Sequence, residues 1–202
     1  MKKSLFLAVS LALAAAAPAY AEESPWSVKF GLGWVNPKSD NGRLANAFDA
    51  EVSSELNLTP AIEYRLADNW AAELLLAVPF KHDVELNGTE AASFKHLPPT
   101  VSLKYLFAPD QAFSPYIGAG LNYTLVFDEE TRGPIAGAKL SGDNSFGPAM
   151  VVGFEYRNNS PWGFAVDLRW IDIDSELRLG GAKIGDLNVD PIVANISLSY
   201  HF

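Results

Sequence analysis

The sequence contains no cysteine. A disulfide framework and a metal site built on thiolates are therefore excluded, and the fold must be held by packing and backbone hydrogen bonds. Basic residues are also scarce, because 15 lysines and arginines stand against 24 acidic residues, for a net charge of −9. No stretch has the clustered positive charge of a nucleic-acid interface, so we expect no nucleic-acid partner.

Beyond residue 21, the sequence lacks any apolar run near the 18 residues of a membrane-spanning helix. Residues 1–21 have the pattern of a secretory signal peptide, with a lysine pair, an apolar stretch over 5–17 and an A-x-A site ending at Ala21. A membrane anchor is the alternative, but such a stretch spans only about 20 Å as a helix. We expect cleavage after Ala21. Residues 22–202 then form one exported domain with 13 basic and 24 acidic residues, a net charge of −11.

The sequence has many segments in which apolar and polar residues alternate. Eight segments of about ten residues have apolar side chains at every second position, which predicts β-strands with one apolar face. The segments are 26–35, 56–66, 70–80, 99–107, 116–127, 146–156, 162–170 and 190–202. An exported chain of this kind is either a soluble all-β domain or an outer-membrane barrel, whose strands need only about 9–11 residues.

The two faces of these segments differ in a way that favours the barrel. Aromatic residues stand at both ends of several apolar faces, namely Trp26 with Trp34, Trp70 with Phe80, and Trp162 with Trp170. This spacing is typical of aromatic girdles at two lipid–water interfaces. The other faces are small or charged, with Lys29, Glu63, Arg65, Glu73, Lys104, Glu155, Asp167, Arg169 and His201. Charges of both signs can pair inside a narrow barrel, so we predict a charge network in the lumen.

The connections alternate strictly in length. The links 67–69, 108–115 and 157–161 are short, whereas 36–55, 81–98, 128–145 and 171–190 are long. This indicates an eight-stranded antiparallel transmembrane β-barrel with short periplasmic turns and long extracellular loops. Because an open sheet edge is costly in lipid, the strand that ends at Phe202 must pair on both sides. In the last long link, Gly180 and Gly181 predict the turn of a hairpin beyond the membrane.

Five stretches carry a family resemblance. "AAELLLAVPFKH", "KHLPPTVSLKYLF", "SPYIGAGLNYT", "LRWIDIDS" and "VDPIVANISLSYHF" resemble, in this order, the OmpW family of small outer-membrane channels, which includes AlkL-type proteins. The resemblance covers about residues 26–202. It implies an eight-stranded barrel with a narrow, rather apolar lumen, and passive uptake of small hydrophobic molecules. Some family members are colicin receptors, and a C-terminal aromatic, here Phe202, is part of the signal read by the barrel-assembly machinery.

The resemblance also implies residue roles. An apolar lumen constriction falls on Leu75, which the alternation independently places on the lumen face. A second constricting aromatic falls on Arg169, so a charge replaces part of the apolar gate, and we expect Arg169 to pair with Asp167 or Glu73. The alternation itself places the lumen charge network on Glu63, Arg65, Glu73, Lys104, Glu155 and Asp167. We expect charged pairs among Glu63, Arg65, Lys104, Asp167 and Arg169 to block passage to the periplasm.

Pro79, Pro98 and Pro99 flank one long loop. Proline cannot donate a hydrogen bond to a strand ladder, so prolines mark rim positions and bulges. The alternative function for these three is a local gap in the wall, through which an apolar solute leaves sideways into the bilayer.

Other functions are less supported. A receptor, an adhesin or a structural barrel is the main alternative to a channel. A lipid-modifying enzyme is disfavoured because Ser199 and His201 stand one two-residue step apart, about 6.6–7 Å, too far for a nucleophile and its base. We predict no catalytic residue, metal or cofactor.

His82 and His96 read as isolated polar loop histidines, with a surface metal site as the alternative. The expected partners are outer-membrane lipid, lipopolysaccharide, the assembly machinery and small hydrophobic solutes.

Overall fold

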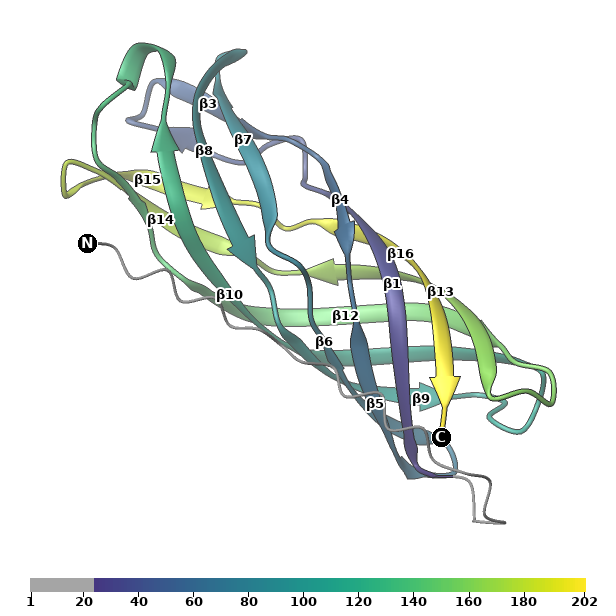
Figure 1. Ribbon diagram of the computed structural model, residues 1–202. Helices are drawn as coiled ribbons and strands as arrows, with labels where there is room; N and C mark the ends of the chain where they lie inside the picture. The colour runs from purple at the N-terminus through teal and green to yellow at the C-terminus, as the bar shows by residue number, and fades with distance from the viewer. Residues whose placement is uncertain (1–23) are drawn as a thin grey trace, which may run out of the picture.

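A computed structural model describes residues 24–202, apart from the side chain of Pro134. The predicted signal peptide therefore lies outside the described residues. The described chain is all-β, and eight antiparallel strands close into a barrel (Figure 1). The wall strands are β1 (Trp26–Asn36), β4 (Glu55–Leu58) continued by β5 (Ala61–Ala67), β6 (Trp70–Leu75), β9 (Thr100–Leu106), β10 (Phe113–Thr131), β12 (Ser145–Tyr156), β13 (Trp162–Ile171) and β16 (Ile192–His201).

The barrel closes between its first and last strands. β1 pairs antiparallel with β16, from Ser27 opposite His201 to Asn36 opposite Ile192, and it pairs with β5 and β4 on its other side. The backbone N–H of Phe202 still donates to the carbonyl of Trp26, over 3.2 Å. The closure predicted for the last strand is therefore present, and no wall edge is left open there.

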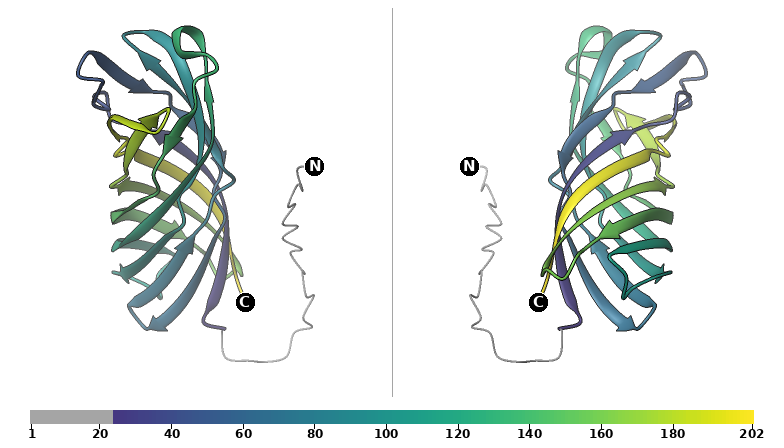
Figure 2. Two further views of the ribbon diagram at one scale, coloured as in Figure 1. Left: turned by 90° about the vertical axis from the view of Figure 1, so that its left-hand side faces the viewer. Right: turned by 90° about the vertical axis from the view of Figure 1, so that its right-hand side faces the viewer.

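Further strands extend the wall at the end where the long links gather. These are β2 (Arg43–Leu44), β3 (Phe48–Val52), β7 (Phe80–Leu86), β8 (Thr89–Leu97), β11 (Leu140–Gly142), β14 (Asp174–Leu179) and β15 (Ala182–Asn188), with one 3₁₀ turn, η1 (Gly133–Ile135). Figures 1 and 2 show them at the end opposite the C-terminus. We call this the long-loop end and the other the short-turn end. Among residues 24–202, no helix is long and apolar enough to cross a membrane.

Three local predictions can be compared with this arrangement. The hairpin at Gly180 and Gly181 is confirmed, since both glycines have positive φ angles (60° and 89°) and join β14 to β15. The expectation of one continuous strand over 56–66 is wrong, because Pro60 lacks a donor and the strand is split there. The expectation of a loop over 81–98 is also wrong, because β7 and β8 pair as a hairpin.

The outward face of the wall is apolar. Large side chains from every wall strand remain exposed there, among them Trp26, Trp34, Leu58, Ile62, Trp70, Val101, Leu121, Met150, Trp162, Leu168, Ile196 and Leu198. A soluble protein would bury such a surface, whereas a lipid bilayer solvates it. The buried side chains face inward and divide by height. They are mostly polar toward the short-turn end and mostly apolar toward the long-loop end.

Candidate functional site

The lower lumen, on the short-turn side, is filled by ion pairs centred on Glu73 of β6. Its Oε2 lies 3.0 Å from Lys29 Nζ and 3.1 Å from Lys104 Nζ, and its Oε1 lies 2.6 Å from Arg169 Nη2. Glu63 binds the same two lysines through Oε2, at 2.8 and 2.7 Å. Strand pairing explains these contacts, because β5 and β6 place Glu63 directly opposite Glu73. Two carboxylates side by side need shared cations.

The network continues across the lumen through Asp167. Arg169 Nε lies 2.7 Å from Asp167 Oδ1, and the Tyr116 hydroxyl donates to Asp167 Oδ2 over 3.0 Å. Asn195 links Asp167 to Thr59, whose hydroxyl donates to Asn195 Oδ1 over 2.6 Å. Arg169 thus pairs with both of the carboxylates that the sequence suggested.

We call Lys29, Glu63, Glu73, Lys104, Asp167 and Arg169 the ion network. Each is at most 5% exposed, and three cations balance three carboxylates. Such a buried and neutral cluster is tolerable only when nearly every charge has a partner. In an eight-stranded barrel, whose interior is just wide enough for side chains, it fills the cross-section.

Two predicted members lie outside the ion network. The Arg65 guanidinium donates to the Asp68 carbonyl at the turn between β5 and β6, and Arg65 is only half-buried. Glu155 Oε1 lies 2.6 Å from His201 Nε2 and accepts a hydrogen bond from Ser199 Oγ, also over 2.6 Å. Ser199 and His201 are therefore bridged by a carboxylate, which leaves the serine with no basic partner of its own in this contact.

Tyr116, Asn195 and Thr59 were missed as members of the network. The alternation did contain the necessary information for Tyr116, because it shares parity with Asn122 and so faces inward. The role of Thr59 could not be read from the sequence, because it depends on the close approach of Thr59 and Asn195 to Gly31 in the folded barrel. A Cβ at Gly31 would lie 2.6 Å from Thr59 Oγ1 and 2.8 Å from Asn195 Oδ1, so the glycine leaves room for their hydrogen bond.

Above the ion network and a small polar layer of Thr100, Asn122 and Thr124, the buried side chains of the lumen are mostly apolar. A cavity of about 30 Å³ lies inside the long-loop end. It is lined mainly by aliphatic and aromatic side chains such as Leu44, Val84, Phe94 and Leu187. We call this the apolar chamber. Its free volume suffices for one or two water molecules, so the lining is nearly closed. Sequence reasoning missed it because β7 and β8 were expected to be a loop.

The wall is incomplete beside this chamber. β6 pairs with β9 up to Leu75 opposite Thr100, and β7 pairs with β8 from Phe80 opposite His96. Between these two pairs, residues 76–79 and 97–99 face each other without ladder pairing. We call this stretch the wall gap. Leu75, which is 4% exposed and points into the lumen, lies at its lower border.

The three candidate prolines all lie in the wall gap, Pro79 on one side and Pro98 with Pro99 on the other. Backbone groups beside the gap bond away from it. Leu76 N–H donates to the Pro60 carbonyl over 2.8 Å, and Tyr123 N–H donates to the Pro99 carbonyl over 3.0 Å. Because proline has no N–H, neither Pro79 nor Pro99 can donate a bond across the gap.

His82 and His96 are not isolated loop histidines, and that expectation is wrong. They are 0% and 1% exposed, on the inner face of the β7–β8 hairpin, with ring centroids 4.7 Å apart. Phe80 and Phe94 pack beside them. Burial lowers the pKa of both imidazoles, and the neighbouring His82 lowers the pKa of His96 further. Both rings are therefore neutral at neutral pH, and neither lies on the surface.

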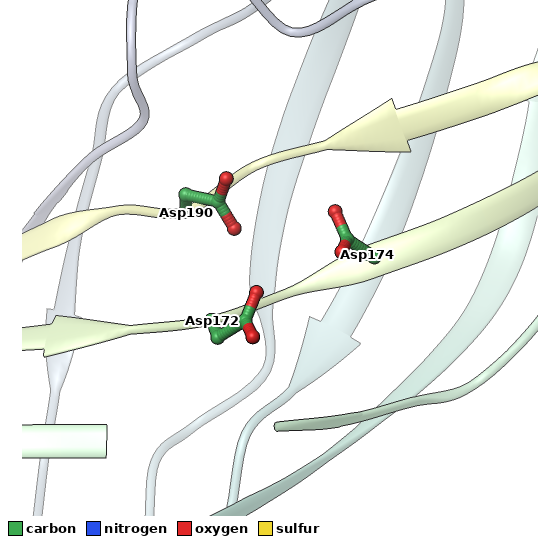
Figure 3. A group of neighbouring side chains, drawn as sticks. All are labelled: Asp172, Asp174 and Asp190. Atoms are coloured by element: carbon green, nitrogen blue, oxygen red, sulfur yellow. The ribbon is translucent and has the colours of Figure 1, made fainter. Parts of the chain in front are cut away.

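An acidic cluster lies at the top of the wall. Asp172 and Asp174, at the junction of β13 and β14, approach Asp190, which precedes β16 (Figure 3). Their carboxylate oxygens lie within 4.8 Å of one another. Lys38 Nζ binds Asp190 at 2.7 Å, and the backbone N–H of Ile173 donates to the same carboxylate. Burial and the neighbouring carboxylates raise the pKa of Asp172 and of Asp174.

Comparison with known proteins agrees with this architecture. A model of the OmpW family matches residues 23–202. Outer membrane protein W of Vibrio cholerae is 33% identical over the full length of both chains. The crystal structure of the outer membrane protein OprG from Pseudomonas aeruginosa superposes with a TM-score of 0.78, at 31% identity, over 89% of this chain and 97% of that one. A third relative, 26% identical over 93% of each chain, is the Pseudomonas aeruginosa protein PahQ, named as a dibenzothiophene metabolism operon protein.

Proposed function

The chain belongs to the OmpW family of outer-membrane proteins, and we propose that it is a channel for passive uptake of small hydrophobic molecules, which leave sideways through the wall gap. Its long-loop end then faces the outside of the cell and its short-turn end the periplasm. The family resemblance implies this class of solute. The relative named after dibenzothiophene metabolism is consistent with it, because that compound is an apolar aromatic.

The position of the wall gap directly above the ion network carries the proposal. A solute that enters from outside meets apolar side chains first, in the apolar chamber. Below them it meets six buried charges that are already paired. An apolar molecule that entered this layer would have to separate ion pairs without replacing any of their interactions. The route of lower free energy leads through the wall at that height.

The wall gap suits such an exit. Opening a regular ladder costs one hydrogen bond for each pair of strand residues separated, and in a bilayer the released groups find no water. Between 76–79 and 97–99 there are no ladder bonds to break. Val78 is 43% exposed on the outer face, so the gap already meets the acyl chains with an apolar side chain.

The chamber must widen during passage, because its free volume of about 30 Å³ is smaller than any of these solutes. Apolar packing permits this more readily than ion pairs do, since dispersion contacts are individually weak and carry little directional preference. The proposed gate is thus the side-chain packing around Leu75, and the ion network is its fixed floor.

The test is uptake of a labelled alkane by cells that express the wild type, Leu75→Glu or Leu75→Met at equal levels in the outer membrane. Glutamate places a charge at the lower border of the wall gap, so uptake should fall at least tenfold. Methionine keeps an apolar side chain of similar volume, so it should leave uptake within about twofold. Equal uptake by all three proteins would refute passage past Leu75.

A further inference from the structure

The His82–His96 pair contains two buried nitrogen atoms that no protein group satisfies. His82 Nε2 and His96 Nδ1 both lack a hydrogen-bond partner, although the two residues are 0% and 1% exposed. A buried polar atom without a partner costs free energy, and most proteins avoid it. At position 96, which lies between Phe80 and Phe94, a phenylalanine would carry no such unsatisfied nitrogen.

The polar residues just below make a useful contrast. Thr124 Oγ1 donates to Asn122 Oδ1 over 2.6 Å, and Asn122 Nδ2 donates to Thr100 Oγ1 over 2.9 Å. These three side chains satisfy one another at the height of the wall gap. The two histidines stand immediately above them, on the hairpin that forms the upper border of the gap, and they do not satisfy each other.

The hydrogen-bonding role of His82 follows from its other nitrogen. His82 Nδ1 lies 2.5 Å from the carbonyl oxygen of Ser53, which can only accept, so Nδ1 carries the proton. In the neutral ring, Nε2 is then an acceptor. His96 lines the apolar chamber, and its neutral ring is free to carry its proton on Nδ1 as a donor. The pair thus offers one acceptor and one donor.

We propose that His96, which lines the apolar chamber, and His82, whose ring centroid lies 4.7 Å from that of His96, bind the hydroxyl group of an otherwise apolar molecule, such as an alcohol or a phenol, through Nδ1 and Nε2 respectively. A hydroxyl donates one hydrogen bond and accepts another, which matches this pair. An alkane satisfies neither nitrogen. The free volume holds a group of this size, and the apolar remainder of the ligand extends toward the wall gap. This inference rests on the proposed channel function and narrows its solutes to those with one hydroxyl.

The first experiment measures binding to the wild-type protein in lipid nanodiscs. Ring nitrogen resonances of the histidines are followed by NMR during titration with 1-octanol and, separately, with octane. We expect 1-octanol to shift the signals of His82 Nε2 and His96 Nδ1, and octane to shift neither. His201, which pairs with Glu155 at the short-turn end, should not respond to either compound. Unchanged signals throughout the 1-octanol titration would mean that the nitrogens meet only water, and would overturn the inference.

The second experiment compares uptake of 1-octanol and octane into liposomes by the wild type and by the double variant His82→Phe/His96→Phe. The ratio of 1-octanol to octane uptake should fall about three- to tenfold, as expected for the loss of one or two ordinary hydrogen bonds. The matched control is His201→Phe, which makes the same chemical change far from the chamber and should keep the wild-type ratio.

The outcomes separate the two proposals. If both compounds enter no faster than with heat-unfolded protein, the channel function itself fails. If both enter and the double variant keeps the wild-type ratio, the channel stands and the hydroxyl site is wrong. Because the nanodisc titration uses unaltered protein, it decides the question even if the double variant does not fold.

Discussion

The lower half of the lumen is lined by charged side chains, and the upper half is lined mainly by apolar ones. The lower half holds six buried charges joined by ion pairs of 2.6 to 3.1 Å. The upper half is an apolar cluster that includes Val35, Leu44, Phe80, Val84 and Leu187. The β6–β9 ladder is unbroken beside the lower half, and the wall loses its ladder beside the upper half.

The two halves of the lumen also differ in how readily their side chains can move, which is the difference that the proposed route requires. Buried ion pairs demand fixed geometry, since displacement of one member leaves a charge unpaired. Apolar side chains lose little when they shift against one another. In the proposed channel, a rigid lower half and a compliant upper half would admit a solute from one side without opening an aqueous pore.

The largest expected effect comes from removing the centre of the ion network. Glu73→Leu leaves Lys29, Lys104 and Arg169 without their common partner, which should lower the free energy of unfolding by about 3–5 kcal/mol. The measurement is urea-induced unfolding of protein refolded into lipid vesicles. Glu85→Gln, at an exposed position outside the wall, should stay within about 0.5 kcal/mol.

A second substitution sharpens this result. Lys104→Met added to Glu73→Leu restores the balance of charge, so the double variant should be more stable than Glu73→Leu alone. A double variant that is less stable by the full sum of the two single changes would show that the residues do not act as a network.

A smaller effect should come from the upper half. Leu187→Ala removes a side chain that is 1% exposed and lines the apolar chamber, so it should cost about 2–3 kcal/mol. The enlarged chamber should also speed alkane uptake. Leu121→Ala truncates a lipid-facing leucine that is 56% exposed and creates no cavity, so it should cost clearly less. Equal losses from both truncations would contradict a packed upper core.

Substitutions in the wall gap should change alkane uptake more than they change the free energy of unfolding. Replacing Pro79 and Pro99 together by alanine supplies an N–H on each side of the gap. If bonds form across it, alkane uptake should fall several-fold, while stability changes by no more than about 1 kcal/mol. Pro148→Ala is the matched control, because Pro148 lies in a paired stretch of β12, opposite Leu121. Uptake that persists in the double proline variant would argue for another exit.

The smallest effect concerns the acidic cluster at the top of the wall. Lys38→Met removes the cation from Asp190, a part-exposed pair worth about 0.2–1 kcal/mol. The pKa values of Asp172 and Asp174 are raised, so their contribution to stability is present at low pH and is lost as pH rises through those values. The cost of Lys38→Met should therefore be larger near pH 7 than near pH 4. Unfolding curves at both pH values check this, and a cost that grows on acidification would be the opposite result.

Much of the barrel was predictable because its solvent imposes a simple rule. Lipid outside and charge inside require strict alternation, which the sequence of each wall strand displays. The closure of β16 on β1 and the β14–β15 hairpin followed from the same reasoning. The β7–β8 hairpin escaped it, because residues 81–98 face water on one side and a small apolar chamber on the other, and they carry no lipid-facing stripe.

The candidate site was also predictable only in part. Parity alone placed Leu75, Glu63, Glu73, Lys104, Asp167 and Arg169 in the lumen. It did not separate Arg65 and Glu155 from the others, because parity gives the face of a strand but not the height at which a tilted strand brings each residue. His82 and His96 were misread for a different reason, because residues 81–98 were expected to form a loop and not the paired strands β7 and β8.

The sequence by itself determined that this chain forms a closed antiparallel barrel with charges inside, since period-two alternation and link lengths are local properties of the chain. Only the tertiary structure decided which charges pair, where the wall loses its ladder, and that two histidines lie buried beside that gap. Those features depend on register between strands that are far apart in sequence, and register is set when the barrel closes.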